Sequence, residues 1–233
     1  MARDPQPPRR RKTTGAATPV RAPRRGRGRP AADAPELRPR LLDAALACYA
    51  GNGIAATSLR DIARQAGVTP ALLHYYFGDR AQLLDAVVEE RILPVMAGVH
   101  AAVADAGDDI GALVVAFVDG MAATIARHPW LPPLWVREVV SEGGALRGLL
   151  SERIAPSIAR LVAQRFAAAQ ARGELNPALD PRLLMVSLVG LTLFPAAGAP
   201  IWQKLYDATD LGVDDLRRHA LALLHRGLEL PHA

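Results

Sequence analysis

The sequence has few aromatic residues and almost no cysteine. Its 233 residues include one cysteine, Cys48, which excludes an internal disulfide and any metal or iron–sulfur site built from several cysteines. Because aromatic residues make up only 5% of the chain, the core must be mainly aliphatic. A reducing, cytoplasmic location is the simplest expectation for such a composition.

The sequence also lacks the motifs of common enzyme sites. It has no GxxxxGK[ST] phosphate loop, no HExxH helix and no GxSxG turn. Its six histidines do not stand at metal-site spacing with acidic partners. We therefore predict no enzymatic activity, no catalytic residues, no cofactor and no metal site.

Long hydrophobic runs are scarce, and one stretch needs weighing as a membrane span. The 21 residues 183–203 carry no charge, which is long enough to cross a bilayer. However, Pro195, Gly198 and Pro200 interrupt this stretch, and its apolar beginning, 183–194, covers only 12 residues. This length favours a buried helix, so we predict no membrane association. A protein anchored by 183–203 remains the alternative, and it would fractionate with lipid.

Positive charge is concentrated at the N-terminus. Residues 1–35 hold ten basic side chains against two acidic ones, Asp4 and Asp33, for a net charge of +8. Since the whole chain carries +5, residues 36–233 carry −3. The segment 1–35 is rich in proline, arginine and glycine and poor in large aliphatic residues, so we predict a disordered basic arm. Such an arm on a mildly acidic body suggests an anionic polymer or surface as partner.

After the arm, almost every segment has the pattern of a helix. The first helix begins near Arg38, and short helices follow after Thr57-Ser58 and after Thr69-Pro70. A long fourth helix begins after Asp79, and Pro94 is expected to kink it. Five more helices are predicted at about 109–127, 133–142, 146–172, 181–197 and 213–229, and Pro156 is expected to bend the third of these. The predicted fold is all-α with about nine helices. It divides into the arm (1–35), a three-helix DNA-binding domain (36–83) and a helical effector-binding and dimerisation domain (84–233).

The second and third helices form a candidate helix-turn-helix. Gly67 lies between them and can adopt the turn conformation that other residues resist. Leu73 and Phe77, one turn apart, anchor the third helix inward. Its outer face then presents Thr69, Pro70, Ala71, His74 and Tyr75. In such a motif the second helix enters the major groove of DNA.

The run from Gly53 to Leu84 resembles the N-terminal signature of the TetR family of bacterial transcriptional regulators. The matching pieces are Thr57-Ser58, Asp61-Ile62-Ala63, Ala66-Gly67-Val68, Leu73, Tyr76-Phe77 and Leu83-Leu84. The resemblance implies DNA contacts at Ser58, Arg60, Thr69, Pro70, Ala71, His74, Tyr75, Tyr76 and Arg80. It also implies a nine-helix fold, a homodimer, a palindromic operator in double-stranded DNA and an unidentified small-molecule effector. His74 and Leu72 depart from the usual pattern, so the operator sequence cannot be inferred.

The arm contains a second candidate DNA element. Arg25, Arg27, Gly28, Arg29 and Pro30 include an Arg-Gly-Arg-Pro stretch similar to an AT-hook core, which binds the narrow minor groove of A·T-rich DNA. The competing interpretation is an unspecific basic arm that raises affinity only. Either way the arm is expected to make DNA binding strongly salt-dependent.

In the predicted body, aromatic residues gather near a proline-rich joint. The candidate effector pocket consists of Phe117, Met121, Trp130, Trp135, Arg137 and Glu138, and ordinary core packing is the alternative for this cluster. The helices 181–197 and 213–229 resemble the dimerisation pair of the family. We predict a homodimeric repressor that leaves its operator when the effector binds. The alternative is an A·T-preferring DNA-organising protein driven by the basic arm.

Overall fold

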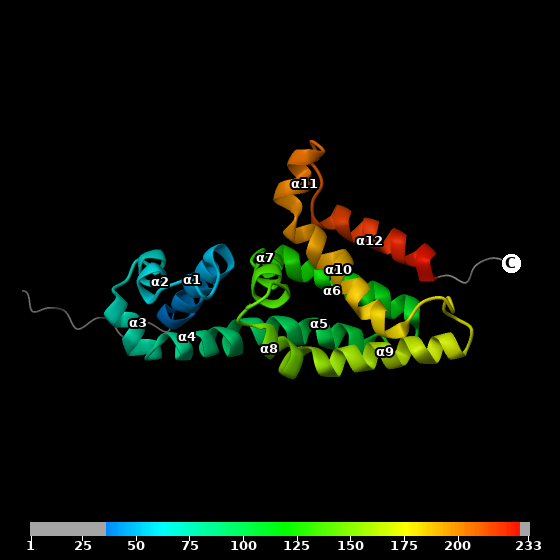
Figure 1. Cartoon of the computed structure of the whole chain (residues 1–233), viewed down its shortest axis with the longest axis horizontal. Coiled ribbons are helices and arrows are strands. Elements are labelled where there is room, and N and C mark those ends of the chain that lie inside the picture. The colour runs from blue at the N-terminus through cyan, green and yellow to red at the C-terminus, as the bar shows by residue number, and fades with distance from the viewer. Residues whose placement is uncertain (1–35, 229–233) are drawn as a thin grey trace, which may run out of the picture. The chain divides into compact units, whose positions relative to one another are not determined.

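The computed structural model describes residues 36–228, and this part of the chain folds into helices joined by turns and loops, without strands (Figure 1). The all-α fold expected from the sequence is confirmed. The described residues form ten continuous helical stretches, one more than the nine predicted. The predicted basic arm, with its Arg-Gly-Arg-Pro stretch, lies outside the described residues.

The first four helices are called the head here. They are α1 (Leu37–Asn52), α2 (Leu59–Ala66), α3 (Pro70–Phe77) and α4 (Arg80–Val87). Ser58 and Asp61 form a capping box at the start of α2, in which each side chain accepts the backbone N–H of the other at 3.2 Å. Gly67 ends α2 with φ of 68°, a left-handed conformation that is costly for residues with a Cβ. Local sequence signals therefore set both ends of α2.

One apolar cluster holds the head together, and all four of its helices contribute to it. Leu42, Leu46 and Tyr49 of α1 are buried, as their helical spacing predicts. Leu73 and Phe77 of α3 are also buried. Full burial of such a side chain contributes about 1.5–3 kcal/mol. These two anchors therefore fix which side of α3 faces the solvent.

Helix α4 continues through the π-helical turn η1 (Val88–Ile92) into α5 (Leu93–Asp105). The sequence predicts a kink at Pro94, and the structure has the π turn end at Ile92, two residues before that proline. Proline has no N–H and its ring crowds the carbonyl four residues back, so a wider turn relieves the conflict. The same arrangement recurs at Pro156, where the π turn η3 (Leu150–Ile154) leads into α9 (Ala155–Ala171).

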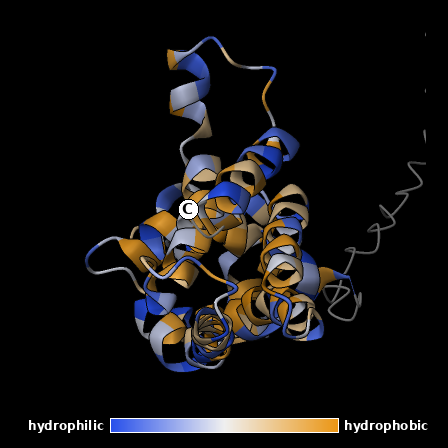
Figure 2. Cartoon of the chain, turned by 90° about the vertical axis from the view of Figure 1, so that its right-hand side faces the viewer, coloured by the Kyte–Doolittle hydropathy of each residue, from blue (hydrophilic) through white to orange (hydrophobic). Residues whose placement is uncertain are grey.

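The helices from α5 onward are called the body. Besides α5 and α9, they are α6 (Ile110–Arg127), α7 (Leu131–Trp135) with the π turn η2 (Val136–Val140), α8 (Arg147–Leu149), α10 (Pro181–Ala197), α11 (Ala199–Leu205) and α12 (Val213–Leu228). A second apolar cluster lies among α5, α6, α9, α10 and α12. Hydrophobic residues gather where these helices face one another (Figure 2). Helix α6 is the centre of this cluster, with eight buried residues.

The uncharged stretch 183–203 does not form one straight helix. It covers most of α10 and the start of α11, and these two helices are bent by 68° relative to each other. Among the described residues, α6 is the one unbroken helix long and apolar enough to cross a membrane, and half of it is buried inside the fold. The apolar character of α6 is therefore explained by its packing against the other body helices.

Candidate nucleic-acid interface and effector cavity

The outer face of α3 is open to solvent. Thr69, Pro70, Ala71, His74 and Tyr75 are all exposed, and the ring of Tyr75 is one of the most exposed large side chains in the described chain. The imidazole of His74 donates from Nδ1 to the carbonyl oxygen of Gly78 at 2.5 Å. The structure thus brings five of the nine predicted DNA-contact positions onto one continuous surface.

The other predicted DNA-contact residues differ in how far their side chains are already engaged in hydrogen bonds within the protein. Arg60 is exposed, whereas the Ser58 hydroxyl donates to the Asp61 carboxylate at 2.5 Å and lowers the pKa of that carboxyl group. Arg80 donates to the carbonyl oxygens of Ile54 and Ala55, the latter at 3.0 Å. Arg80 therefore stabilises the loop before α2 through one guanidinium nitrogen, Nη2. Its other N–H groups are the ones that could bind a DNA phosphate.

Tyr76 is half-buried and packs against the head cluster. Its ring meets that of Tyr75 edge-on, with centroids 5.5 Å apart. The guanidinium of Arg38 in α1 lies 4.7 Å from the ring centroid of Phe77 and pairs with Glu90 at 2.5 Å. These contacts hold α3 against α1 and η1, so the exposed face of α3 is presented by a fixed scaffold.

A buried carboxylate joins the head to the body. Glu138, in η2, accepts the backbone N–H of Ile54 at 2.8 Å through Oε1 and that of Ala145 at 3.1 Å through Oε2. Next to it, Arg137 donates to the carbonyl oxygens of Ala50 and Gly51 at the end of α1. Neither residue is among those that line the cavity of about 610 Å³ described next. The predicted pocket residues Arg137 and Glu138 thus contact the head instead.

A cavity of about 610 Å³ lies among α5, α6, α7–η2, α9 and α10 of the body. Phe117, Met121 and Trp135, three of the six predicted pocket residues, line it. Trp130 does not, and packs between the two apolar clusters beside His128. The sequence reasoning missed the lining residues of α9 and α10, because their helical periodicity alone does not separate a cavity wall from ordinary core.

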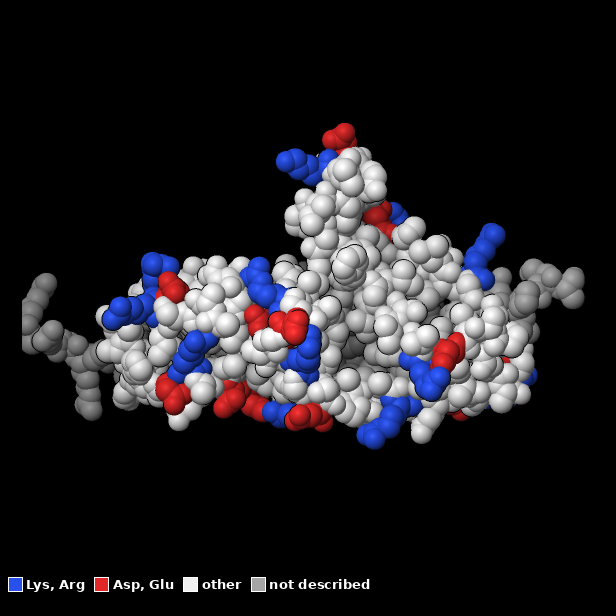
Figure 3. All heavy atoms as spheres, in the orientation of Figure 1, with Lys and Arg blue, Asp and Glu red and all other residues white. Residues whose placement is uncertain are grey.

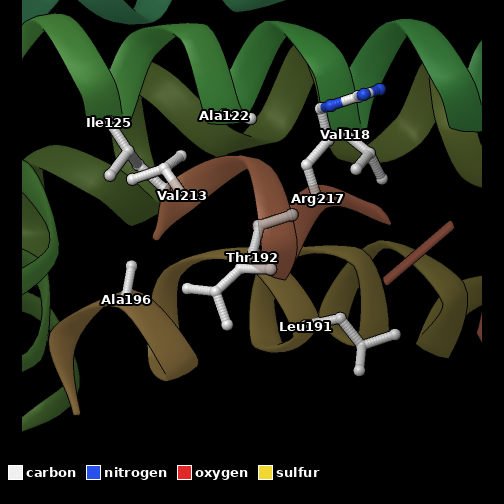
Figure 4. Close-up of a pocket in the computed structure, with 9 residues that line it drawn as sticks. Val118, Ala122, Ile125, Leu191, Thr192, Ala196, Val213 and Arg217 are labelled. Carbon is white, nitrogen blue, oxygen red and sulfur yellow. The ribbon is translucent and has the colours of Figure 1, made fainter. Parts of the chain in front are cut away.

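A smaller cavity, where α6, α10 and α12 meet, is too small for a ligand. Figure 4 shows side chains from α6, α10 and α12 converging there, including Val118, Thr192 and Val213. They enclose about 10 Å³, roughly the space of a single water molecule. Arg217 of α12 reaches across to Asp119 of α6 at 2.9 Å. This junction therefore fastens α12 to α6.

An uncharged surface extends over α10 and the base of α11 on the face shown in Figure 3. Leu183, Val186 and Phe194 of α10 and Ile201 of α11 are exposed apolar residues of this surface, and Leu205 and Tyr206 are exposed at the far end of α11. Exposed apolar side chains gathered in this way are typical of interaction surfaces.

Taken together, these features define a helical protein with an N-terminal helix-turn-helix and a helical body that holds an apolar cavity of about 610 Å³. The family model described as "Bacterial regulatory proteins, tetR family" matches residues 41–87. Residues 41–87 therefore form a DNA-binding region of the tetR type, and the family model does not extend into the body.

Individual relatives agree with this assignment. The HTH-type transcriptional regulator BetI of Rhizobium meliloti is 48% identical over 54 residues, which are 23% of this chain and 27% of that protein, so the match spans about a quarter of the relative. The transcriptional repressor SCO4008 of Streptomyces coelicolor is 27% identical over 80% of this chain and 92% of its own. The structure of FadR from Bacillus subtilis in complex with stearoyl-CoA has the same fold, with a TM-score of 0.61, 19% identity, and coverage of 82% of this chain and 100% of FadR.

Proposed function

We propose that this protein is a sequence-specific transcriptional repressor, which binds a palindromic operator as a homodimer and releases it when a small molecule occupies the 610 Å³ cavity. The single observation that carries this proposal is the exposed outer face of α3, held by the buried anchors Leu73 and Phe77. Residues at the start of such a helix contact base edges when the helix lies in the major groove.

The second copy of the chain is proposed to bind at α10 and α12. Leu183 and Val186 of α10 and Leu223 of α12 are exposed on these helices. Because a two-fold dimer presents both α3 helices symmetrically, the DNA site would be palindromic. We expect Leu223→Glu to yield monomers in size-exclusion chromatography with light scattering. Val115→Glu, a change at a similarly exposed residue of α6, is expected to leave the dimer intact.

Coupling between cavity and DNA is proposed to pass through the segment α7–η2. Trp135, Val136 and Val140 line the cavity, while Leu134 packs in the head cluster and Glu138 holds the loop at Ile54. A ligand that displaces this segment therefore displaces the head directly. An effector lowers operator affinity only by the difference between its affinities for the two head positions.

The experiment that tests the function is selection of bound sequences from a random duplex pool at near-physiological salt. We expect a two-fold palindromic motif that persists when residues 1–35 are deleted. Tyr75→Ala should abolish the enrichment, whereas Tyr206→Ala, which removes an equally exposed tyrosine beyond α11, should preserve it. Enrichment of A·T content alone, lost together with the arm, would replace this function with the DNA-organising alternative.

A further inference from the structure

The wall of the 610 Å³ cavity is almost entirely apolar. Twenty-one residues line it, and only His100, Trp135 and Arg182 among them carry polar side-chain atoms. The volume lies in the range of about 300–1,000 Å³ that is usual for sites of drug-sized ligands. The chemistry of the ligand is therefore decided by these three polar groups.

Arg182 is not a free cation for this cavity. Its side chain is 83% exposed and binds the carboxylate of Asp180 through three N–H···O contacts of 2.5, 3.0 and 3.2 Å. The pairing raises the pKa of Arg182 and lowers that of Asp180 to about 2, so both groups are charged at neutral pH. Arg182 thus lies at the solvent-exposed rim and is paired with Asp180, so an anionic group buried deeper in the cavity would have no buried arginine or lysine as counter-ion among the described lining residues.

Two of the three polar lining groups, the ring of His100 and the indole N–H of Trp135, have no hydrogen-bond partner within residues 36–228, and His100 is the one of the two that can also accept. Its ring is half-buried in α5, and within residues 36–228 neither ring nitrogen has a hydrogen-bond partner. Burial lowers the pKa of His100, so the imidazole is neutral at pH 7. A neutral imidazole offers one donor and one acceptor, and it can satisfy one polar group of a ligand without requiring that group to be charged.

We propose that the effector is an uncharged, predominantly apolar molecule whose single hydrogen-bonding group binds His100. This proposal rests on the proposed function, because it takes the cavity as the effector site. It excludes ligands that bury a carboxylate, sulfonate or phosphate in the cavity.

Two fluorescent probes with the same ring skeleton test the charge requirement. N-phenyl-1-naphthylamine is neutral, and 1-anilinonaphthalene-8-sulfonate differs from it by one sulfonate group. We expect the neutral probe to bind the full-length protein at least about tenfold more tightly, because the cavity offers nothing to replace the hydration of the sulfonate. Equal or tighter binding of the sulfonate, displaced by filling the cavity, would overturn the proposal.

Substitutions within α9 locate the binding site. Ala159 lines the cavity, and Ala168 of the same helix is exposed and does not line it. Ala159→Phe is expected to abolish binding of the neutral probe, and Ala168→Phe to leave it unchanged, with circular dichroism confirming that both variants fold. His100→Leu, which keeps the cavity apolar, is expected to weaken the neutral probe about two- to tenfold. Unchanged binding of the neutral probe in either Ala159→Phe or His100→Leu would overturn the proposal.

The probe experiment uses no DNA, so its failure is distinct from failure of the proposed function. An absent palindrome in the selection experiment would refute the repressor while leaving probe binding intact. A sulfonate that binds in the cavity would refute the uncharged ligand while leaving operator binding intact.

Discussion

Replacement of Glu138 is the sharpest test of the connection between head and body. This carboxylate is only 4% exposed, and its two oxygens accept backbone N–H groups from both sides of the junction, Ile54 of the head and Ala145 of the body. The approach is close, since a Cβ placed on Gly53 would lie 3.1 Å from Oε1. Glu138→Ala leaves both donors unpaired, and Glu138→Gln keeps one acceptor oxygen in a side chain of the same size.

The expected loss follows from the burial of the donors left unpaired. A buried donor without a partner costs about 1–3 kcal/mol, and this applies to the Ile54 N–H, because Ala145 is exposed and water can replace its acceptor; Glu138→Ala should therefore lower the free energy of unfolding by about 1–3 kcal/mol. Glu138→Gln should cost less, because its amide oxygen can still accept the Ile54 N–H. Glu142→Ala provides the control: this residue lies four positions later, is exposed, and should change stability by no more than about 0.5 kcal/mol.

The assay is urea unfolding followed by circular dichroism at one fixed protein concentration, because dimerisation would make stability concentration-dependent. The reasoning would be refuted if Glu138→Ala differed from the wild type by less than about 0.5 kcal/mol, or if the alanine and glutamine variants lost the same amount. Operator affinity of Glu138→Gln, measured on the selected sequence, should also become less sensitive to a cavity ligand.

Three further predictions concern single positions. Tyr75→Ala should abolish operator binding in a mobility-shift assay with unfolding free energy within about 0.5 kcal/mol of wild type, whereas Phe77→Ala should lose about 3–5 kcal/mol. Burial lowers the pKa of His100 below its ordinary 6.5, so the unfolded chain protonates first as pH falls. Stability should therefore decrease below pH 6.5, and His100→Leu should remove that part of the pH dependence; a pH profile identical in both proteins would contradict this. Gly67→Ala should cost about 1–2 kcal/mol because of its left-handed φ, while Gly98→Ala within α5, where a Cβ meets no atom within 4 Å, should gain up to about 1 kcal/mol in thermal or urea unfolding.

The head could be predicted from sequence because its signals are local. Ser58 as a cap, Gly67 as a left-handed residue and Pro70 in a first turn each act within a few residues, and each stands in the structure where the sequence placed it. The outer face of α3 followed from the two buried anchors. The exact contacts with DNA remain predictions, since they depend on a partner molecule.

The body could be predicted only in outline. The sequence predicts that helical structure stops at 197 because Gly198 and Pro200 follow, yet Pro200 lies in the first turn of α11, where a proline needs no N–H partner. Arg137 and Glu138 were assigned to the pocket by their nearness in sequence to Trp135. Helical spacing argues against placing Glu138 in the pocket. Leu134 and Glu138, four residues apart, lie on the side of the helix that contacts the head. Val136 and Val140, also four apart, lie on the side that lines the cavity.

The placement of tryptophan makes the protein a convenient optical system. All three tryptophans, Trp130, Trp135 and Trp202, belong to the body. The aromatic residues of the head are tyrosines and Phe77, and none of them absorbs at the red edge of the tryptophan band. Trp135 lines the cavity, whereas the indole of Trp202 in α11 donates to the carbonyl oxygen of Pro195 at 2.8 Å. Emission excited at the red edge of the absorption band therefore reports on the body alone, and a ligand that quenches Trp135 can be followed by titration without any label on the protein.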